Sequence, residues 1–169
     1  MFFSNEILSK TKEVKYKLRV LFWNTYKNEN INPIICEIVA ENNISMIVLA
    51  EYNANMEDLL NTLFNTSGLS FQQYCSACER IKILGTKCNI EPRFEKGYVT
   101  IQIINGKDIL CCVHLNSKIY SNHIGYREIL IGEIIQEIQK VESDLNTENT
   151  IVVGDFNWNP MKIPSVNKT

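Results

Sequence analysis

Hydrophobic and polar residues alternate in blocks along the chain, and the blocks predict a regular series of elements. Continuous apolar runs rich in β-branched and aromatic residues predict strands, and Met46–Ala50 has the pattern of a strand covered on both faces. An Asn105-Gly106 pair between two such runs predicts a hairpin turn. The predicted strands lie at 18–23, 46–50, 71–75, 81–84, 98–104, 109–113 and 150–153.

Between some of these strands, apolar residues recur at helical spacing. Helices are predicted from about Pro33, over 56–64 and over 124–141. The last of these helices carries Ile129, Ile134, Ile135 and Ile138. The mixed order of strands and helices predicts an α/β fold with sheet packed under helices. We expect one domain over residues 18–160, preceded by a lead-in at 1–17 and followed by a tail at 161–169.

Composition narrows the class of protein only a little. The chain of 169 residues is 45% hydrophobic and 21% charged, so it can build a real core. Its formal net charge of −2 does not indicate a protein that lives wrapped on nucleic acid, although an enzyme that touches nucleic acid briefly remains compatible with it. The N-terminus turns polar at once and no apolar run is long enough to cross a membrane, so we expect a cytoplasmic protein with no membrane partner.

The six cysteines include a CxxC pair, Cys75 and Cys78. In a reducing compartment free thiols are the default, and a structural zinc site would need a second pair or histidines at matching spacing. A zinc or redox role for this pair is therefore the weaker interpretation.

Polar residues follow four of the predicted strands in a similar manner. Asn24 ends the first strand, Glu51 the second and His114 a later one, while the last strand runs into Gly-Asp-Phe-Asn with Asp155 and Asn157. Ligand sites in α/β proteins collect where strands end, and in extended chain Asp155 and Asn157 point the same way. Oxygen ligands suit Mg²⁺ or Mn²⁺, and amides and an imidazole can donate to phosphate oxygens.

The alternative is that strand ends are polar only because loops are solvated. That explanation is sufficient for Asn24, Glu51 or His114 taken singly. It is weaker for Asp155 and Asn157 together, since both side chains are costly to bury unpaired directly after an apolar strand.

Four segments of the chain resemble, in the same order, successive motifs of the endonuclease/exonuclease/phosphatase family. They are Phe22–Thr25, Leu49–Tyr52, Val113–Lys118 and Val153–Pro160. The resemblance covers residues 18–160, and Gly-Asp-Phe-Asn is its most specific part. It implies a four-layer α/β sandwich, in which two packed sheets are flanked by helices, and hydrolysis of a phosphoester by in-line attack on phosphorus.

The resemblance also implies a role for each motif residue. Glu51 would be the main ligand of Mg²⁺ or Mn²⁺, with Asn24 in support. Asp155 would orient or deprotonate the attacking water. Asn157 would hydrogen-bond the phosphate, and His114 would donate to a phosphate oxygen.

Lys118 and Arg127 are further candidates for contacts with the phosphate of the substrate. For both residues an ordinary solvated charge is the favoured alternative.

The chain departs from the family pattern after Pro160. Family members carry a late Ser-Asp-His whose Asp and His act as a dyad, and no histidine follows His123 here. We therefore expect a fold that is incomplete at the C-terminus, and very weak activity or none. An incomplete sheet also predicts an exposed edge through which copies of the chain could self-associate.

These observations leave two main function hypotheses, besides the redox or zinc role of Cys75 and Cys78. The first is a divalent-metal-dependent phosphodiesterase or phosphatase, with DNA or RNA as the leading substrate class. The second is a non-catalytic fragment or binding module on the same fold.

Overall fold

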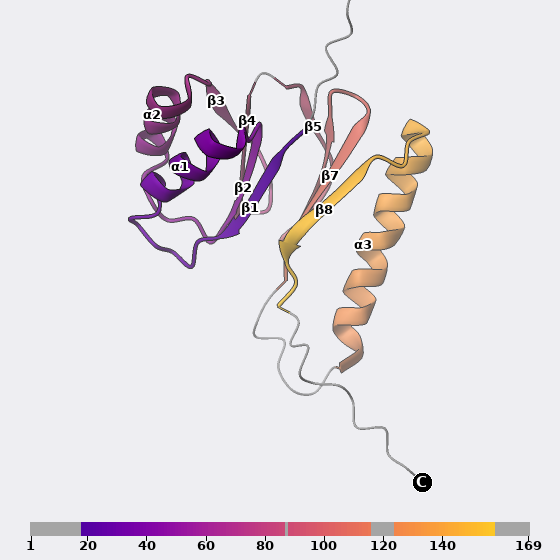
Figure 1. Ribbon diagram of the computed structural model, residues 1–169. Coiled ribbons are helices and arrows are strands. Elements are labelled where there is room, and N and C mark those ends of the chain that lie inside the picture. Colours follow the sequence, from indigo (N-terminus) through magenta and orange to yellow (C-terminus); the bar gives the residue numbers. More distant parts are fainter. Residues whose placement is uncertain (1–17, 87, 116–123, 158–169) are drawn as a thin grey trace, which may run out of the picture.

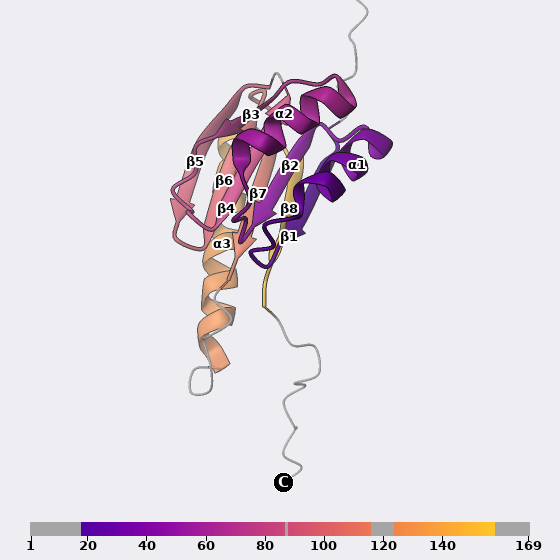
Figure 2. The same cartoon turned by 90° about the vertical axis from the view of Figure 1, so that its left-hand side faces the viewer.

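The computed structural model describes residues 18–86, 88–115 and 124–157, and these form four layers. Two four-stranded sheets pack face to face in the middle, with helices α1 and α2 outside one sheet and α3 outside the other (Figure 1). Figure 2 shows α1 and α2 lying across the outer face of their sheet. The predicted four-layer α/β sandwich is confirmed.

The first sheet has the strand order β1-β2-β4-β3. Its parallel pair, β1 and β2, is connected through α1, and the remaining strands pair antiparallel. Helix α2 begins at an N-cap, Asn55, whose side chain accepts a hydrogen bond from the Asp58 N–H, and it ends at Gly68 in the left-handed conformation. The elements are β1 (Val20–Asn24), α1 (Asn32–Asn42), β2 (Met46–Ala50), α2 (Met56–Ser67), β3 (Phe71–Tyr74) and β4 (Ile81–Thr86).

The second sheet has the order β5-β6-β7-β8, and its parallel pair, β7 and β8, is connected through α3. The predicted hairpin is confirmed, because Asn105 and Gly106 both have positive φ in the turn between β6 and β7, as a type I′ turn requires. The elements are β5 (Ile90–Lys96), β6 (Val99–Ile104), β7 (Asp108–His114), α3 (Ile124–Leu145) and β8 (Thr150–Asp155).

Strand β5 was not predicted by the apolar pattern. Its sequence is Ile-Glu-Pro-Arg-Phe-Glu-Lys, and all of its residues are exposed or half-buried. Pro92 lies at a register shift in its pairing with β6. An edge strand needs no continuous apolar run, and its charges and proline discourage further pairing, so it resembles a loop in the sequence.

Alternation along the strands sorts the core into separate layers. Even-numbered positions of β2 and β7, such as Met46, Val48 and Cys112, pack between the sheets, whereas odd-numbered positions face the helices. The buried face of α3 differs from the predicted one, since Ile129 and Ile135 are exposed. The residues of α3 buried against the sheet are Leu130, Ile134 and Val141.

The edges of the sandwich are built differently. The β5 edge carries a proline, a register shift and charged side chains, whereas β1 and β8 are edge strands with almost no charge. Strands β1 and β8 also contact each other across the sheets, so both open edges lie on one side. Self-association through these edges stays a prediction, which sedimentation at increasing protein concentration would test.

Within the described residues, no helix is long and apolar enough to cross a membrane.

Candidate active site at the ends of the parallel strands

The polar residues singled out in the sequence meet where β1, β2, β7 and β8 end, at the lower end of the sheets in Figure 1. Parallel pairing places Asn24 beside Ala50 in one sheet and His114 beside Asp155 in the other. The strand ends of both sheets are therefore at one level. We call the set Asn24, Glu51, His114, Asp155 and Asn157 the rim.

The first contact across the sheets joins Asn24 and Asp155. The Asn24 side-chain amide donates to Asp155 Oδ2 over 2.8 Å, and Asn24 Oδ1 accepts from the Tyr26 N–H over 3.0 Å. Both Asn24 and Asp155 are half-buried. The amide nitrogen and the carbonyl oxygen of the Asn24 side chain are both hydrogen-bonded within the protein. Asn24 therefore mainly orients the Asp155 carboxylate.

The second contact across the sheets joins Glu51 and His114. His114 Nε2 lies 3.2 Å from Glu51 Oε1, with the His114 side chain 2% exposed and the Glu51 side chain 30% exposed. The approach is close but poorly aligned, so neither ring nitrogen of His114 has a hydrogen-bond partner in the described part of the chain. A buried imidazole in this condition is costly to folding and remains free to bind a ligand.

Glu51 reaches this contact because of its backbone. Strand alternation would point residue 51 toward the face covered by α1 and α2, as it does Ile47 and Leu49. Glu51 instead has φ of 50°, in the left-handed region, and its carboxylate reaches His114 on the opposite sheet. The conformation is uncommon for a residue other than glycine or asparagine and marks strain at this position.

Thr25 is a residue of the site that sequence reasoning missed. Its side chain is buried, and its hydroxyl donates to the Glu51 carbonyl over 2.8 Å. Tyr52 follows Glu51 in the sequence, and its hydroxyl donates to Asn32 Oδ1 over 2.7 Å. Burial raises the pKa of Tyr52 to about 12, so this phenol stays a donor. A small polar residue after a strand end carries no specific signal in one sequence.

The end of β8 departs from the extended chain expected there. The strand stops at Asp155, and Asn157 has φ of 48°. The Asn157 N–H donates to Asp155 Oδ1 over 2.8 Å, and its side-chain amide donates to the Leu115 carbonyl over 2.5 Å. A Cβ atom at Gly154 would lie 2.1 Å from the Val113 carbonyl oxygen, so this position of Gly-Asp-Phe-Asn requires glycine.

The remaining candidates cannot be placed at the rim. Lys118, the side chain of Arg127 and residues 158–160 lie outside the part of the chain that the structure describes. The expected phosphate contacts of Lys118 and Arg127 therefore stay predictions.

The donors at the rim fit a cation that keeps most of its waters. Among the described residues, no group of three or more His, Cys, Asp and Glu side chains is arranged to hold a metal ion. Mg²⁺ needs only one or two carboxylates from the protein. The partly exposed Glu51 carboxylate meets that requirement, and the unpartnered nitrogens of His114 beside it are suited to an anion that accompanies the ion.

The two thiols of the CxxC pair differ in exposure. All six cysteines are free; Cys75 is exposed, whereas Cys78 is buried and its thiol donates to the Gly97 carbonyl over 3.4 Å. Burial raises the pKa of Cys78, which lowers its reactivity.

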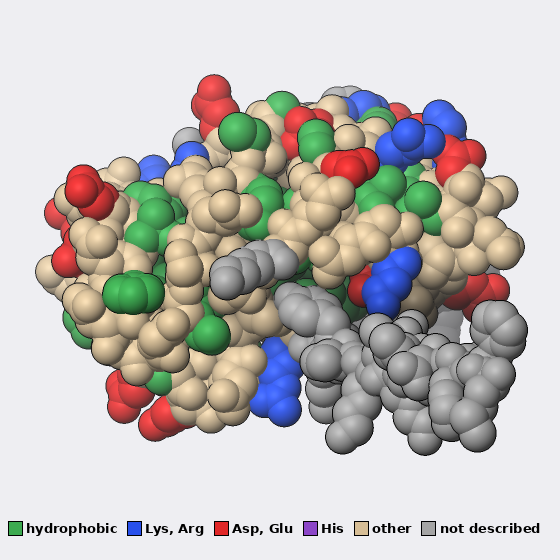
Figure 3. All heavy atoms as spheres, turned by 90° about the horizontal axis from the view of Figure 1, so that it is seen from above, with side chains coloured by type: hydrophobic (Ala, Val, Ile, Leu, Met, Phe, Trp, Pro, Cys, Tyr) green, Lys and Arg blue, Asp and Glu red, His purple; other side chains and the backbone are tan. Residues whose placement is uncertain are grey.

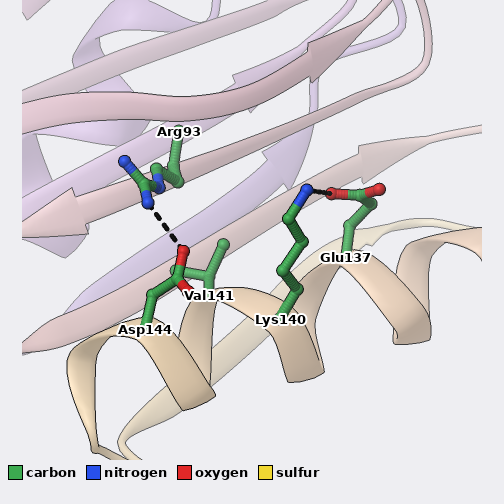
Figure 4. Close-up of a pocket in the computed structure, with 5 residues that line it drawn as sticks. All are labelled: Arg93, Glu137, Lys140, Val141 and Asp144. Carbon is green, nitrogen blue, oxygen red and sulfur yellow. Dashed lines mark hydrogen bonds and ion pairs between the residues drawn. The ribbon is translucent and has the colours of Figure 1, made fainter.

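A surface pocket of about 200 Å³ lies between β5 and α3 (Figure 4). Arg93 and Asp144 form an ion pair of 2.7 Å there, and Lys140 and Glu137 approach to 4.0 Å. Its charges are paired with each other, and it contains none of the rim residues.

Charges on the face seen in Figure 3 are intermingled. Lys and Arg side chains lie among Asp and Glu side chains, and this face shows no broad basic field. This face is the end of the sandwich opposite the rim, and it lacks the electrostatic footprint of a surface that binds nucleic acid without regard to sequence.

Comparison at the sequence level finds no relative. No family model matches the chain, and no curated protein matches it.

Comparison of the fold does find similar solved structures. The endonuclease domain of TRAS1, a telomere-specific non-LTR retrotransposon, matches with a TM-score of 0.54 and 13% identity, over 86% of this chain and 61% of that one. TDP2 of D. rerio in complex with a single-strand DNA product matches with 0.50 and 17%, over 84% and 61%. The mannosyl-6-phosphatase Bt3783 of Bacteroides thetaiotaomicron matches with 0.54 and 12%, over 86% and 67%.

The chain thus has the two-sheet α/β sandwich that these proteins share. It is the endonuclease/exonuclease/phosphatase fold, as the motif resemblance implies. The chain spans about two thirds or less of the length of these structures.

Proposed function

We propose that this chain carries the metal- and phosphate-binding part of a phosphoester hydrolase site. The observation behind the proposal is the pair of contacts across the sheets at the rim, Asn24 with Asp155 and Glu51 with His114. Together they place two carboxylates and a buried, unpartnered imidazole at one end of the sandwich. A structural role alone does not account for an imidazole left without hydrogen bonds beside a strained carboxylate.

The proposed roles follow from what each side chain is free to do. His114 has an unpartnered ring N–H to offer to a phosphate oxygen. Asp155 is held by the Asn24 amide and by the Asn157 N–H, so its carboxylate is oriented to hold an attacking water and to accept its proton.

Glu51 is the residue that would hold the cation. The engaged Oδ1 of Asn24 retains a second lone pair, which allows the supporting contact that the resemblance implies. A bound Mg²⁺ or Mn²⁺ would supply charge neutralisation on the phosphate as the transition state forms.

Nucleic acid is the leading substrate class. Two of the similar structures are an endonuclease domain and a protein bound to a single-strand DNA product, while the third is a sugar phosphatase.

Mn²⁺ binding and hydrolysis together test the proposal. Wild type, Glu51→Gln and Glu95→Gln are titrated with Mn²⁺ by electron paramagnetic resonance, and then assayed for plasmid nicking and for hydrolysis of a chromogenic phosphodiester. Glu95 is a half-buried carboxylate that makes no hydrogen bond to a rim residue, so Glu95→Gln is the matched control. We expect Glu51→Gln alone to lose Mn²⁺ binding.

Hydrolysis by the 169-residue chain is expected to be very weak. Equal Mn²⁺ affinity in wild type and Glu51→Gln would reject Glu51 as the ligand. Binding of Mn²⁺ and of DNA without any turnover would favour the second hypothesis, a non-catalytic binding module.

A further inference from the structure

In the described part of the chain, left-handed backbone conformations of residues other than glycine and asparagine lie just after the ends of β1 and β2. Among the described residues other than glycine and asparagine, only Tyr26, Lys27 and Glu51 have positive φ, with values of 48°, 59° and 50°. Asparagine tolerates this conformation through local hydrogen bonds, but for other residues it costs about 1–2 kcal/mol each. The conformation of Glu51 therefore needs contacts that hold it.

The loop after β1 supplies those contacts. The Thr25 hydroxyl lies 2.8 Å from the Glu51 carbonyl oxygen and 3.2 Å from that of Ala50. The backbone N–H groups of Thr25 and Lys27 donate to the same two carbonyls, each over 2.9 Å. On the other side, the Glu51 N–H donates to the Arg80 carbonyl over 3.0 Å.

Among these contacts to Glu51 only the Thr25 hydroxyl belongs to a side chain, and so only it depends on residue type. Thr25 is 3% exposed, and its hydroxyl is turned to the backbone of the second strand end. Loss of a buried hydroxyl would leave the Glu51 carbonyl with one donor, from Lys27, instead of two.

We propose that Thr25 is a positioning residue, whose hydroxyl holds Glu51 in the left-handed conformation that turns its carboxylate across the sheets to His114. The expected change in Mn²⁺ affinity rests on the proposed function, in which Glu51 binds the cation. The hold of Thr25 on the Glu51 backbone does not depend on that function. Thr25 acts through the backbone of Glu51 and touches no substrate. Groups that orient a metal ligand typically change metal affinity by about tenfold or more when removed.

Three variants separate positioning from simple stability. Thr25→Val keeps the shape of the side chain without its hydroxyl, and Thr25→Ser keeps the hydroxyl. Thr100→Val removes another fully buried hydroxyl, which bonds Glu95 in the second sheet and makes no hydrogen bond to a rim residue. Mn²⁺ affinity is measured by electron paramagnetic resonance, and exchange of the Lys27 amide proton is followed by NMR.

We expect Thr25→Val to weaken Mn²⁺ binding about tenfold and to speed exchange of the Lys27 amide. Thr25→Ser should restore both properties, and Thr100→Val should change neither, although it lowers stability. Wild-type affinity for Mn²⁺ in Thr25→Val would overturn the inference. If the wild type itself binds no Mn²⁺, the proposed function fails, and unchanged Lys27 exchange in Thr25→Val would separately reject the hold on Glu51.

Discussion

Two groups of polar side chains lie between the sheets, and they differ in how fully they are satisfied. In the first group, Glu95 Oε1 accepts hydrogen bonds from the Ala77 N–H over 3.0 Å, from the Thr100 hydroxyl over 3.0 Å and from the Gln102 amide over 3.3 Å. We call these four residues the Glu95 cluster. At the rim, both ring nitrogens of His114 lack hydrogen bonds.

The backbone differs in the same sense. No residue of the Glu95 cluster has positive φ, whereas Glu51 and Asn157 at the rim do. One atom of the Glu95 cluster, Gln102 Oε1, also lacks a partner, but the amide nitrogen of that side chain is bound. The Glu95 cluster is thus arranged to stabilise the fold, and the rim carries costs that folding alone does not explain.

The largest effect on stability should come from the Glu95 cluster. Glu95→Ala removes the acceptor of three donors, two of them on fully buried side chains, so the free energy of unfolding should fall by about 3 kcal/mol. Glu51→Ala should change it by less than about 1 kcal/mol. Urea denaturation of both variants gives the comparison, and equal losses would remove the distinction between the two groups.

Removing a buried polar side chain from each group should have opposite effects. His114→Leu deletes two ring nitrogens that have no hydrogen bond, at the cost of the contact with the partly exposed Glu51, so the free energy of unfolding should rise by about 1 kcal/mol. Gln102→Leu deletes the amide that donates to Glu95 and Thr100, so the free energy of unfolding should fall by about 1 kcal/mol. Thermal unfolding with both variants at matched concentration measures the signs. A clear loss in His114→Leu would mean that the imidazole is structural.

The smallest effect concerns strain at the rim. Glu51→Gly relieves the strain of the left-handed backbone at φ of 50°, but it also raises the conformational entropy of the unfolded chain. The free energy of unfolding should therefore rise by only about 0.5 kcal/mol. The same variant should lose Mn²⁺ binding. Denaturation and Mn²⁺ titration of one preparation measure both. Reduced stability in Glu51→Gly would show that the Glu51 side chain contributes to folding beyond the cost of its conformation.

Most of the elements could be predicted because burial leaves a pattern in the sequence. Strand β2 is fully buried and reads as a continuous apolar run, and the Asn-Gly turn has a specific backbone requirement. Strand β5 could not be predicted, since half-exposed edge strands need neither alternation nor apolar runs. The predicted buried face of α3 is also inaccurate, because isoleucines occur on both the buried and the exposed face of this helix.

The site could be predicted in its residues but not in its geometry. Polar side chains after apolar strands indicated Asn24, Glu51, His114 and Asp155, and the structure brings these together. Strand alternation predicts the wrong direction for Glu51, since its position depends on a backbone torsion that no local residue pattern signals. The catalytic and metal-binding roles of these residues stay predictions.

The contact between Asn24 and Asp155 spans 131 positions of the chain, which has a consequence for the order of folding. The antiparallel β5-β6-β7 meander needs only short loops, whereas the rim requires both parallel crossovers to be complete. Loop closure of this length is entropically slow, so the rim should assemble after the transition state. Asn24→Ala should then mainly accelerate unfolding and leave the refolding rate nearly unchanged, which stopped-flow chevron analysis would measure.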